Sequence, residues 1–150
     1  MISRSKNFTI LLANDDDDQC FLIKEALQEV ELTINLYFVK DGEQLLDYLY
    51  HRADYQAPST SPRPHLILLD LNMPGISGLE ALPVIKSDTN LRPIPIVILT
   101  TSHQKGDIFR AYDLGANSFI AKPVTFEGLV EVMKSLCHYW FDVVSLIYST

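Results

Sequence analysis

The sequence lacks the features that mark membrane, secreted and nucleic-acid-binding proteins. No apolar run approaches the roughly 20 residues that a membrane-spanning helix needs, and the first residues contain no apolar signal-peptide segment. The 12 basic residues are outnumbered by 19 acidic ones, and the net charge of −7 includes no basic stripe that could neutralise nucleic-acid phosphates. We therefore expect a cytoplasmic protein that binds neither a membrane nor nucleic acid.

Cysteine, histidine and glycine are too sparse or too poorly spaced to suggest a metal cluster or a nucleotide loop. Cys20 and Cys137 lie far apart inside predicted helices, so we expect two buried thiols. The four histidines are His51, His65, His103 and His138. They share no ligand spacing, and we expect each to be solvated or hydrogen-bonded within the fold. The absence of a glycine-rich phosphate loop argues against nucleotide binding.

The order of predicted strands and helices defines the fold class. Apolar strands are expected at residues 8–13, 34–39, 66–69, 96–99 and 118–121. Helices are expected at residues 21–30, after Asp41, at 78–87 after Ser77, at 104–114 and from 126 after Thr125. Five alternating pairs predict an α/β fold, a doubly wound five-stranded parallel sheet with helices on both faces. We expect one domain over 1–150, with a core of about 8–136 and a helical extension of about 137–150.

The strand at 66–69 leads directly into a carboxylate. Four consecutive apolar residues are too continuous for a half-exposed strand, so this is expected to be a central strand covered on both faces. Asp70 follows it, and Pro74 and Gly75 mark a turn shortly afterwards. Asp70 is therefore expected at the carboxyl end of the sheet, where ligands bind in open α/β folds.

Four chemically active side chains are expected to meet at that edge. Asp15, Asp70, Thr100 and Lys122 each follow or end a predicted strand. Clustered carboxylates repel unless a cation intervenes, and oxygen ligands with water suit Mg²⁺. An ammonium and a hydroxyl aimed at the same point can stabilise a transferring phosphoryl group, with Asp70 as the nucleophile. Each side chain alone has an ordinary structural interpretation, but together they favour function.

Several segments, taken together, closely resemble the receiver domain of two-component response regulators over residues 8–140. They are Asn14-Asp15-Asp16, residues 66–75 (LILLDLNMPG), residues 97–102 (VILTTS), residues 112–119 (YDLGANSF) and Lys122-Pro123. Each segment is weak evidence alone, whereas all of them in this order are specific. The resemblance implies the flavodoxin-like strand order 2-1-3-4-5.

The resemblance also implies the chemistry of the site. Asp70 would accept a phosphoryl group from the phosphohistidine of a sensor histidine kinase, and Thr100 and Lys122 would contact that group. Mg²⁺ would be held by Asp15, Asp70 and the backbone carbonyl of Asn72. The protein would not be an enzyme in the usual sense, because it would catalyse only its own phosphorylation and dephosphorylation.

Two further positions take their expected roles from the family. Phe119 matches the switch aromatic, expected to move inward when Thr100 turns toward the phosphoryl group. This would change the face made by the fourth helix, the fifth strand and the last helix. The Lys122–Pro123 peptide bond is expected to be cis, which is permitted before proline.

Asn14 departs from the family pattern, because an acid that contacts the metal through water usually stands there. Its amide oxygen could still accept that hydrogen bond, but one negative charge is missing, so we expect weaker Mg²⁺ binding. A shifted alternative, in which Asp16 takes one of the two acidic roles, stays open. Asp17 and Asp18 are more simply interpreted as an acidic helix start.

The end of the chain indicates how the phosphorylated protein would pass its signal on. The residues after the receiver are too few for an output module, so we expect signalling by protein contact. The tail is rich in aromatic and apolar residues from Tyr139 to Tyr148. Either it folds back onto the core, or it helps to form a homodimer face with the fourth helix, fifth strand and last helix, which we favour. The tail and residues 100–102 resemble the small regulators paired with bacterial phytochrome-type kinases.

Two other functions compete with this interpretation. A phosphohydrolase with an aspartyl nucleophile is one, although the chain lacks the second acid two residues after Asp70 and any cap insertion. A degenerate receiver that only binds partners is the other, and Asn14 keeps it open. The intact Asp70, Thr100 and Lys122 favour a working phosphoacceptor.

Overall fold

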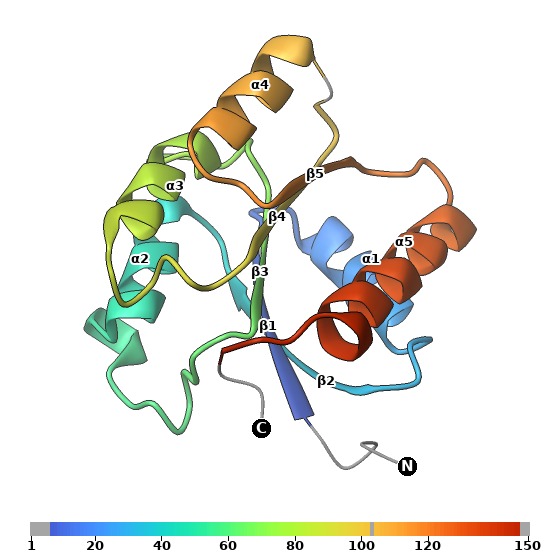
Figure 1. The fold of residues 1–150 in the computed structure, drawn as a ribbon, viewed down its shortest axis with the longest axis horizontal. Coiled ribbons are helices and arrows are strands. Elements are labelled where there is room, and N and C mark those ends of the chain that lie inside the picture. Colours follow the sequence, from blue (N-terminus) through green and yellow to red (C-terminus); the bar gives the residue numbers. More distant parts are fainter. Residues whose placement is uncertain (1–6, 103, 148–150) are drawn as a thin grey trace.

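The protein folds around one parallel sheet of five strands in the order β2-β1-β3-β4-β5, which confirms the expected topology (Figure 1). The computed structural model describes residues 7–102 and 104–147. The strands are β1 (Asn7–Ala13), β2 (Thr33–Val39), β3 (Leu66–Leu69), β4 (Ile96–Thr100) and β5 (Ser118–Ala121). All adjacent pairs are parallel, so every strand ends at the same edge of the sheet.

Helices cover both faces of this sheet. They are α1 (Asp17–Leu27), α2 (Gly42–Tyr50), α3 (Gly78–Ser87), α4 (Lys105–Asp113) and α5 (Phe126–His138). Figure 1 shows α1 and α5 on one side and α2 and α3 on the other, and α4 joins α2 and α3 through Ala111, which packs into their core. Within the described part of the chain, no helix combines the length and the apolar character needed to cross a bilayer.

The central strand β3 shows why its sequence is continuously apolar. Ile67 and Leu69 pack into the core beneath α2 and α3, whereas Leu66 and Leu68 pack into the core beneath α1 and α5. All four side chains are fully buried. A strand buried on both faces needs apolar residues at every position rather than at alternate ones.

The start of α1 differs from the expected helix, which was placed four residues later. Asp16 is the N-cap, and its Oδ1 accepts hydrogen bonds from the backbone N–H groups of Asp18 and Gln19 at 2.9 and 3.2 Å. Asp17 and Asp18 occupy the first turn, where carboxylates favour the helix dipole. Hydrophobic spacing alone missed this polar turn because it has no buried side chain before Cys20.

The chain after α5 continues as a single π-helical turn, Tyr139–Val143. Phe141 is buried and stacks on Phe8 with ring centroids 4.3 Å apart, and Leu146 packs against the same core. The tail therefore folds back at these residues, although Tyr139, Val143 and Ile147 remain exposed. Tyr148 lies outside the described residues.

Candidate phosphoacceptor site

Asp70 lies directly after β3 in a nearly closed environment. Its side chain is only 9% exposed, and its backbone N–H donates to the carbonyl of Ala13 on β1 at 3.0 Å. Oδ1 accepts hydrogen bonds from the backbone N–H of Asn72 at 3.0 Å and from Thr100 Oγ1 at 2.9 Å. The carboxylate is thus fixed by two donors on one oxygen, which leaves Oδ2 less engaged.

Lys122 approaches that second oxygen from the end of β5. Its Nζ lies 3.4 Å from Asp70 Oδ2, and the lysine side chain is also only 9% exposed. The backbone N–H of Lys122 donates to the carbonyl of Thr100 at 2.8 Å, which fixes the lysine beside β4. Adjacent parallel strands therefore bring Asp70, Thr100 and Lys122 together, as the sequence predicted.

The prediction of a cis peptide bond between Lys122 and Pro123 is wrong. No cis bond occurs among the described residues, so Lys122–Pro123 is trans. The trans form is the favoured one before proline, by about 0.5–1 kcal/mol. Lys122 Nζ still reaches Asp70 with this bond trans, so the geometry of the site does not require the cis form.

The acidic loop after β1 places its residues in different surroundings. Asn14 is buried, and its Oδ1 accepts a hydrogen bond from the backbone N–H of Asp16 at 2.8 Å. Asp15 and Asp16 are both exposed. Because Asp16 Oδ1 caps α1, its proposed alternative role near a metal would have to use the other oxygen.

The oxygen ligands at this edge fit a hard divalent cation. Mg²⁺ is usually held by one or two carboxylates together with waters and other oxygens. Asp15 and Asp70 supply two carboxylates at the ends of the neighbouring strands β1 and β3, and the Asn72 carbonyl follows on the same loop as Asp70. No cluster of three or more Asp, Glu, His or Cys side chains suited to a metal occurs in residues 7–102 and 104–147. A two-carboxylate site completed by a carbonyl is consistent with that finding.

Phe119 lies on β5, the strand beside Thr100. It pairs with Ile98 of β4, while Thr100 pairs with Ala121. The Phe119 ring is half-buried and packs against the core beneath α2 and α3, and its backbone N–H donates to the Tyr112 hydroxyl at 3.1 Å. Phe119 therefore lies on the strand next to Thr100 and is connected to α4 through Tyr112.

The described histidines contact neighbouring residues of the fold, and both cysteine thiols are buried, as expected. The His65 Nδ1 accepts from the Thr9 N–H at 2.9 Å, and His51 Nε2 lies 2.8 Å from the Ser61 carbonyl. Both thiols are buried, and burial raises the pKa of Cys137 to about 12. His138 lies 3.5 Å from Asp142, whereas His103 lies outside the described residues.

Gln19 is the one residue of the site that the sequence did not indicate. It lies in the second half of the first turn of α1, and its Oε1 contacts both Lys122 Nζ and Asn14 Nδ2. A half-buried glutamine at the start of an acidic helix carries no chemical signature in the sequence. Only the packing of α1 beside α5, on one side of the sheet, makes it part of the site.

Comparison with known proteins decides the family. The family model of the response regulator receiver domain matches residues 10–134. The chain belongs to this family. As a receiver domain it is part of two-component signalling, and its sheet order is that of its structural relatives.

Individual relatives resemble this receiver domain over almost its whole length. The response regulator Rcp1 of Synechocystis sp. is 34% identical over 137 residues, which cover 91% of each chain. The phosphorylated cyanobacterial phytochrome response regulator RcpA is 36% identical with a TM-score of 0.87, over 95% of this chain and 99% of that one. The Mn²⁺-bound form of Rcp1 has a TM-score of 0.83 at 34% identity, over 93% and 98% of the two chains.

Proposed function

We propose that Asp70 is the phosphoacceptor of this receiver domain and takes its phosphoryl group from the phosphohistidine of a sensor histidine kinase. The observation that carries the proposal is the convergence on one buried carboxylate of Thr100 Oγ1 at 2.9 Å and Lys122 Nζ at 3.4 Å. A hydroxyl and an ammonium at these positions can stabilise charge on the equatorial oxygens of a transferring phosphoryl group. We further propose that residues 1–150 form one receiver domain.

Asp70 Oδ2 is the oxygen that we assign as the nucleophile, because Oδ1 already accepts two hydrogen bonds. Its electron pair forms the new O–P bond as the P–N bond to the donor histidine breaks. The electrons of that bond remain on the imidazole nitrogen, and because the other ring nitrogen of the phosphohistidine carries a proton, the histidine leaves as a neutral imidazole. The product is an acyl phosphate on Asp70.

Asp15, Asp70 and the backbone carbonyl of Asn72 would hold Mg²⁺ at this site. The bound ion would supply positive charge that offsets repulsion between the carboxylates and the incoming phosphoryl oxygens. The described residues fit such an ion, and Rcp1 has been solved in a form with Mn²⁺ bound. The role of Asn14 or Asp16 in a water-mediated contact to the ion stays a prediction.

The partner that we propose is a sensor histidine kinase of the phytochrome type. The support is the similarity to RcpA, described as a phytochrome response regulator, over most of both chains. The phosphorylated state would be read by contact with another protein through the face of α4, β5 and α5, after Thr100 and Phe119 have moved. The cytoplasmic location stays a prediction from the sequence.

Phosphorylation can be tested by intact mass after incubation with acetyl phosphate, with and without Mg²⁺. We expect one phosphoryl adduct that requires the metal and is absent from Asp70→Ala. Asp54→Ala is a matched control, because Asp54 is an exposed carboxylate between α2 and β3, away from the site. Failure of the wild type to form an adduct, either with acetyl phosphate or with a phosphorylated kinase, would favour the binding-module alternative. Turnover of phosphomonoesters would favour a phosphohydrolase.

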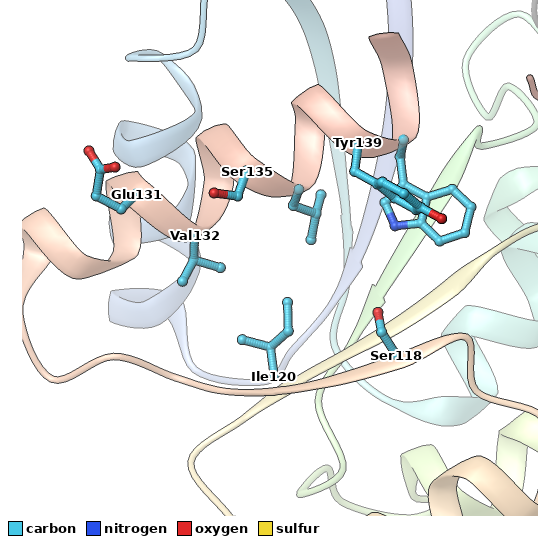
Figure 2. A pocket seen from close by; sticks show the side chains of 8 residues that line it. Ser118, Ile120, Glu131, Val132, Ser135 and Tyr139 are labelled. Carbon is cyan, nitrogen blue, oxygen red and sulfur yellow. The ribbon is translucent and has the colours of Figure 1, made fainter. Parts of the chain in front are cut away.

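We also propose that the receiver forms a homodimer through the face of α4, β5 and α5. On α4, Phe109 is 72% exposed. A groove of about 470 Å³ lies between β5 and α5, and its apolar lining includes Ile120, Val132 and Trp140. Figure 2 shows Ile120 of β5 and Val132 of α5 pointing toward one another in it. Apolar side chains that are exposed together on one face are typical of an interaction surface.

Light scattering coupled to size exclusion tests this dimer at high micromolar concentration. We expect Phe109→Glu to give monomers, because a carboxylate in an apolar interface loses its hydration. Phe21→Glu is the matched control, since Phe21 is 61% exposed on α1, away from α4. A wild type that remains monomeric whether or not it is phosphorylated would contradict the proposal.

A further inference from the structure

Gln19 links the loop after β1 to the lysine of the site. Its Oε1 accepts a hydrogen bond from Asn14 Nδ2 at 3.2 Å and also contacts the Lys122 ammonium. The same ammonium lies 3.4 Å from Asp70 Oδ2. Lys122 is therefore shared between a neutral amide oxygen and the carboxylate that we assign as the nucleophile.

The ion pair between Lys122 and Asp70 is longer than a direct charged hydrogen bond. A direct hydrogen bond between an ammonium and a carboxylate is usually about 2.7–2.9 Å long. The separation of 3.4 Å between Lys122 Nζ and Asp70 Oδ2 is longer than this, whereas Nζ is in close contact with Gln19 Oε1. Gln19 thus competes with Asp70 for the ammonium.

Asn14 fixes the orientation of the Gln19 amide. An amide oxygen accepts hydrogen bonds and an amide nitrogen donates them, so two donors facing the same atom of Gln19 require that atom to be oxygen. The Asn14 amide is itself fixed, because its Oδ1 accepts from the backbone N–H of Asp16 at 2.8 Å. The chain of hydrogen bonds runs from the start of α1 through Asn14 to Gln19.

A carboxylate at position 14 could not support this arrangement. An ionised aspartate has no donor, so it could not hold Gln19 Oε1 toward the lysine. The departure of Asn14 from the usual acid and the presence of Gln19 are therefore linked features of this chain. Both side chains are removed from full solvent contact, which strengthens their hydrogen bonds.

We propose that Gln19 is a positioning residue that shares the Lys122 ammonium with Asp70 and limits the closure of their ion pair before phosphoryl transfer. This inference rests on the proposed function of Asp70 as phosphoacceptor. With Gln19 in place, Asp70 Oδ2 retains an electron pair for the incoming phosphorus, and the Lys122 ammonium lies next to it. The phosphoryl oxygens then offer the ammonium a charged acceptor in place of the neutral amide.

The variant Gln19→Leu removes the acceptor and keeps a side chain of similar size. Without it, Lys122 is expected to close its ion pair with Asp70 and cover Oδ2. We expect phosphorylation by acetyl phosphate, followed by intact mass, to become about tenfold slower, the scale of a lost hydrogen bond to a charged group. Gln19→Glu retains an acceptor oxygen but adds a charge, so it is expected to hold the ammonium more strongly than the neutral amide and also to slow phosphorylation.

Gln28→Leu is the matched control, because Gln28 is an exposed glutamine at the other end of α1. A second measurement reads the lysine directly, through the ¹⁵N resonance of its ammonium in the unphosphorylated protein without metal. Lys122→Arg identifies the resonance by its loss. We expect Gln19→Leu to shift it and Gln28→Leu to leave it in place.

The two measurements separate this inference from the proposed function. A wild type without a phosphoryl adduct would overturn both. A phosphorylated wild type together with an unchanged rate in Gln19→Leu would overturn the positioning role and leave the phosphoacceptor in place. A slower rate with an unmoved lysine resonance would also overturn it, since Gln19 would then act by another route.

Discussion

A Cβ atom built on Gly78 would lie 2.5 Å from the backbone oxygen of Asp70. Gly78 is the first residue of α3, so this contact sets how closely α3 approaches the end of β3. The phosphoacceptor loop is therefore held between a strand end and a helix start with no room for a methyl group. The loop between them contains Asn72, whose N–H orients the Asp70 carboxylate.

We expect Gly78→Ala to lower the free energy of unfolding by about 1–3 kcal/mol, because the backbone must shift to admit the methyl group. Urea unfolding measures this loss. Gly106→Ala in α4 is the control, since its Cβ would meet no atom within 4 Å. That substitution should stabilise the protein by about 0.5–1 kcal/mol through helix propensity. Equal effects of the two substitutions would contradict the close-contact explanation.

Thr100→Val tests the hydroxyl that reaches Asp70. Valine fills nearly the same space but leaves Oδ1 without one of its two donors. We expect phosphorylation to become about 100- to 1000-fold slower, the range found for the loss of a positioned donor. Thr100→Ser keeps the hydroxyl and should retain most of the rate. If the serine variant were as slow as the valine variant, the methyl group rather than the hydroxyl would be the important feature.

Asn14→Asp restores the missing charge beside the proposed metal site. Because Asn14 is buried, the new carboxylate should lower the melting temperature without metal, and Mg²⁺ should reverse this loss. We expect Mg²⁺ to bind about tenfold more tightly than in the wild type, since affinity rises with the charge of the ligands. Calorimetric titration measures the affinity.

Asn35→Asp is the control for the added charge, because Asn35 is exposed on β2. It should change neither the metal affinity nor the response of the melting temperature to Mg²⁺. An Asn14→Asp variant that binds Mg²⁺ no more tightly than the wild type would contradict the charge argument.

The buried thiol of Cys137 predicts how the stability of the fold and the reactivity of this cysteine depend on pH. Burial raises its pKa from 9.0 to about 12, so the folded state keeps the thiol protonated over a range in which the unfolded chain ionises. The stability contributed by this group is fully present below pH 9 and falls as the pH rises toward 12. In Cys20→Ser at pH 8, we expect Cys137 to react with a disulfide reagent about a thousandfold more slowly in the folded protein than in the denatured one. Reaction at the denatured rate would show that the thiol is accessible.

Sequence patterns predicted the strands well because their signal is local. Residues 66–69 are apolar at every position since β3 is covered on both faces, and the structure places β3 at those same residues. The start of α1 was placed too late because Asp16 to Gln19 are polar and form no apolar stripe. The cap at Asp16 is a hydrogen-bonding feature, which hydrophobic spacing does not detect.

The meeting of Asp70, Thr100 and Lys122 could also be predicted, because parallel strands end at a common edge. Gln19 could not, since its contact with Lys122 joins residues 103 positions apart through the packing of α1 on the α5 side of the sheet. The trans bond at Lys122–Pro123 was likewise decided by the folded backbone, whose hydrogen bond to Thr100 already brings the lysine to the site.

The sequence by itself determined the parallel direction of the five strands, the edge of the sheet that carries the chemistry and the residue types available there, whereas the strand order came from the family resemblance. These follow from apolar periodicity, from turn residues and from the common direction of parallel strands. The tertiary structure alone decided which acceptor the Lys122 ammonium contacts and how closely α3 approaches Asp70. Those relationships depend on separations of a few tenths of an ångström between distant segments, which are fixed only when both cores are packed.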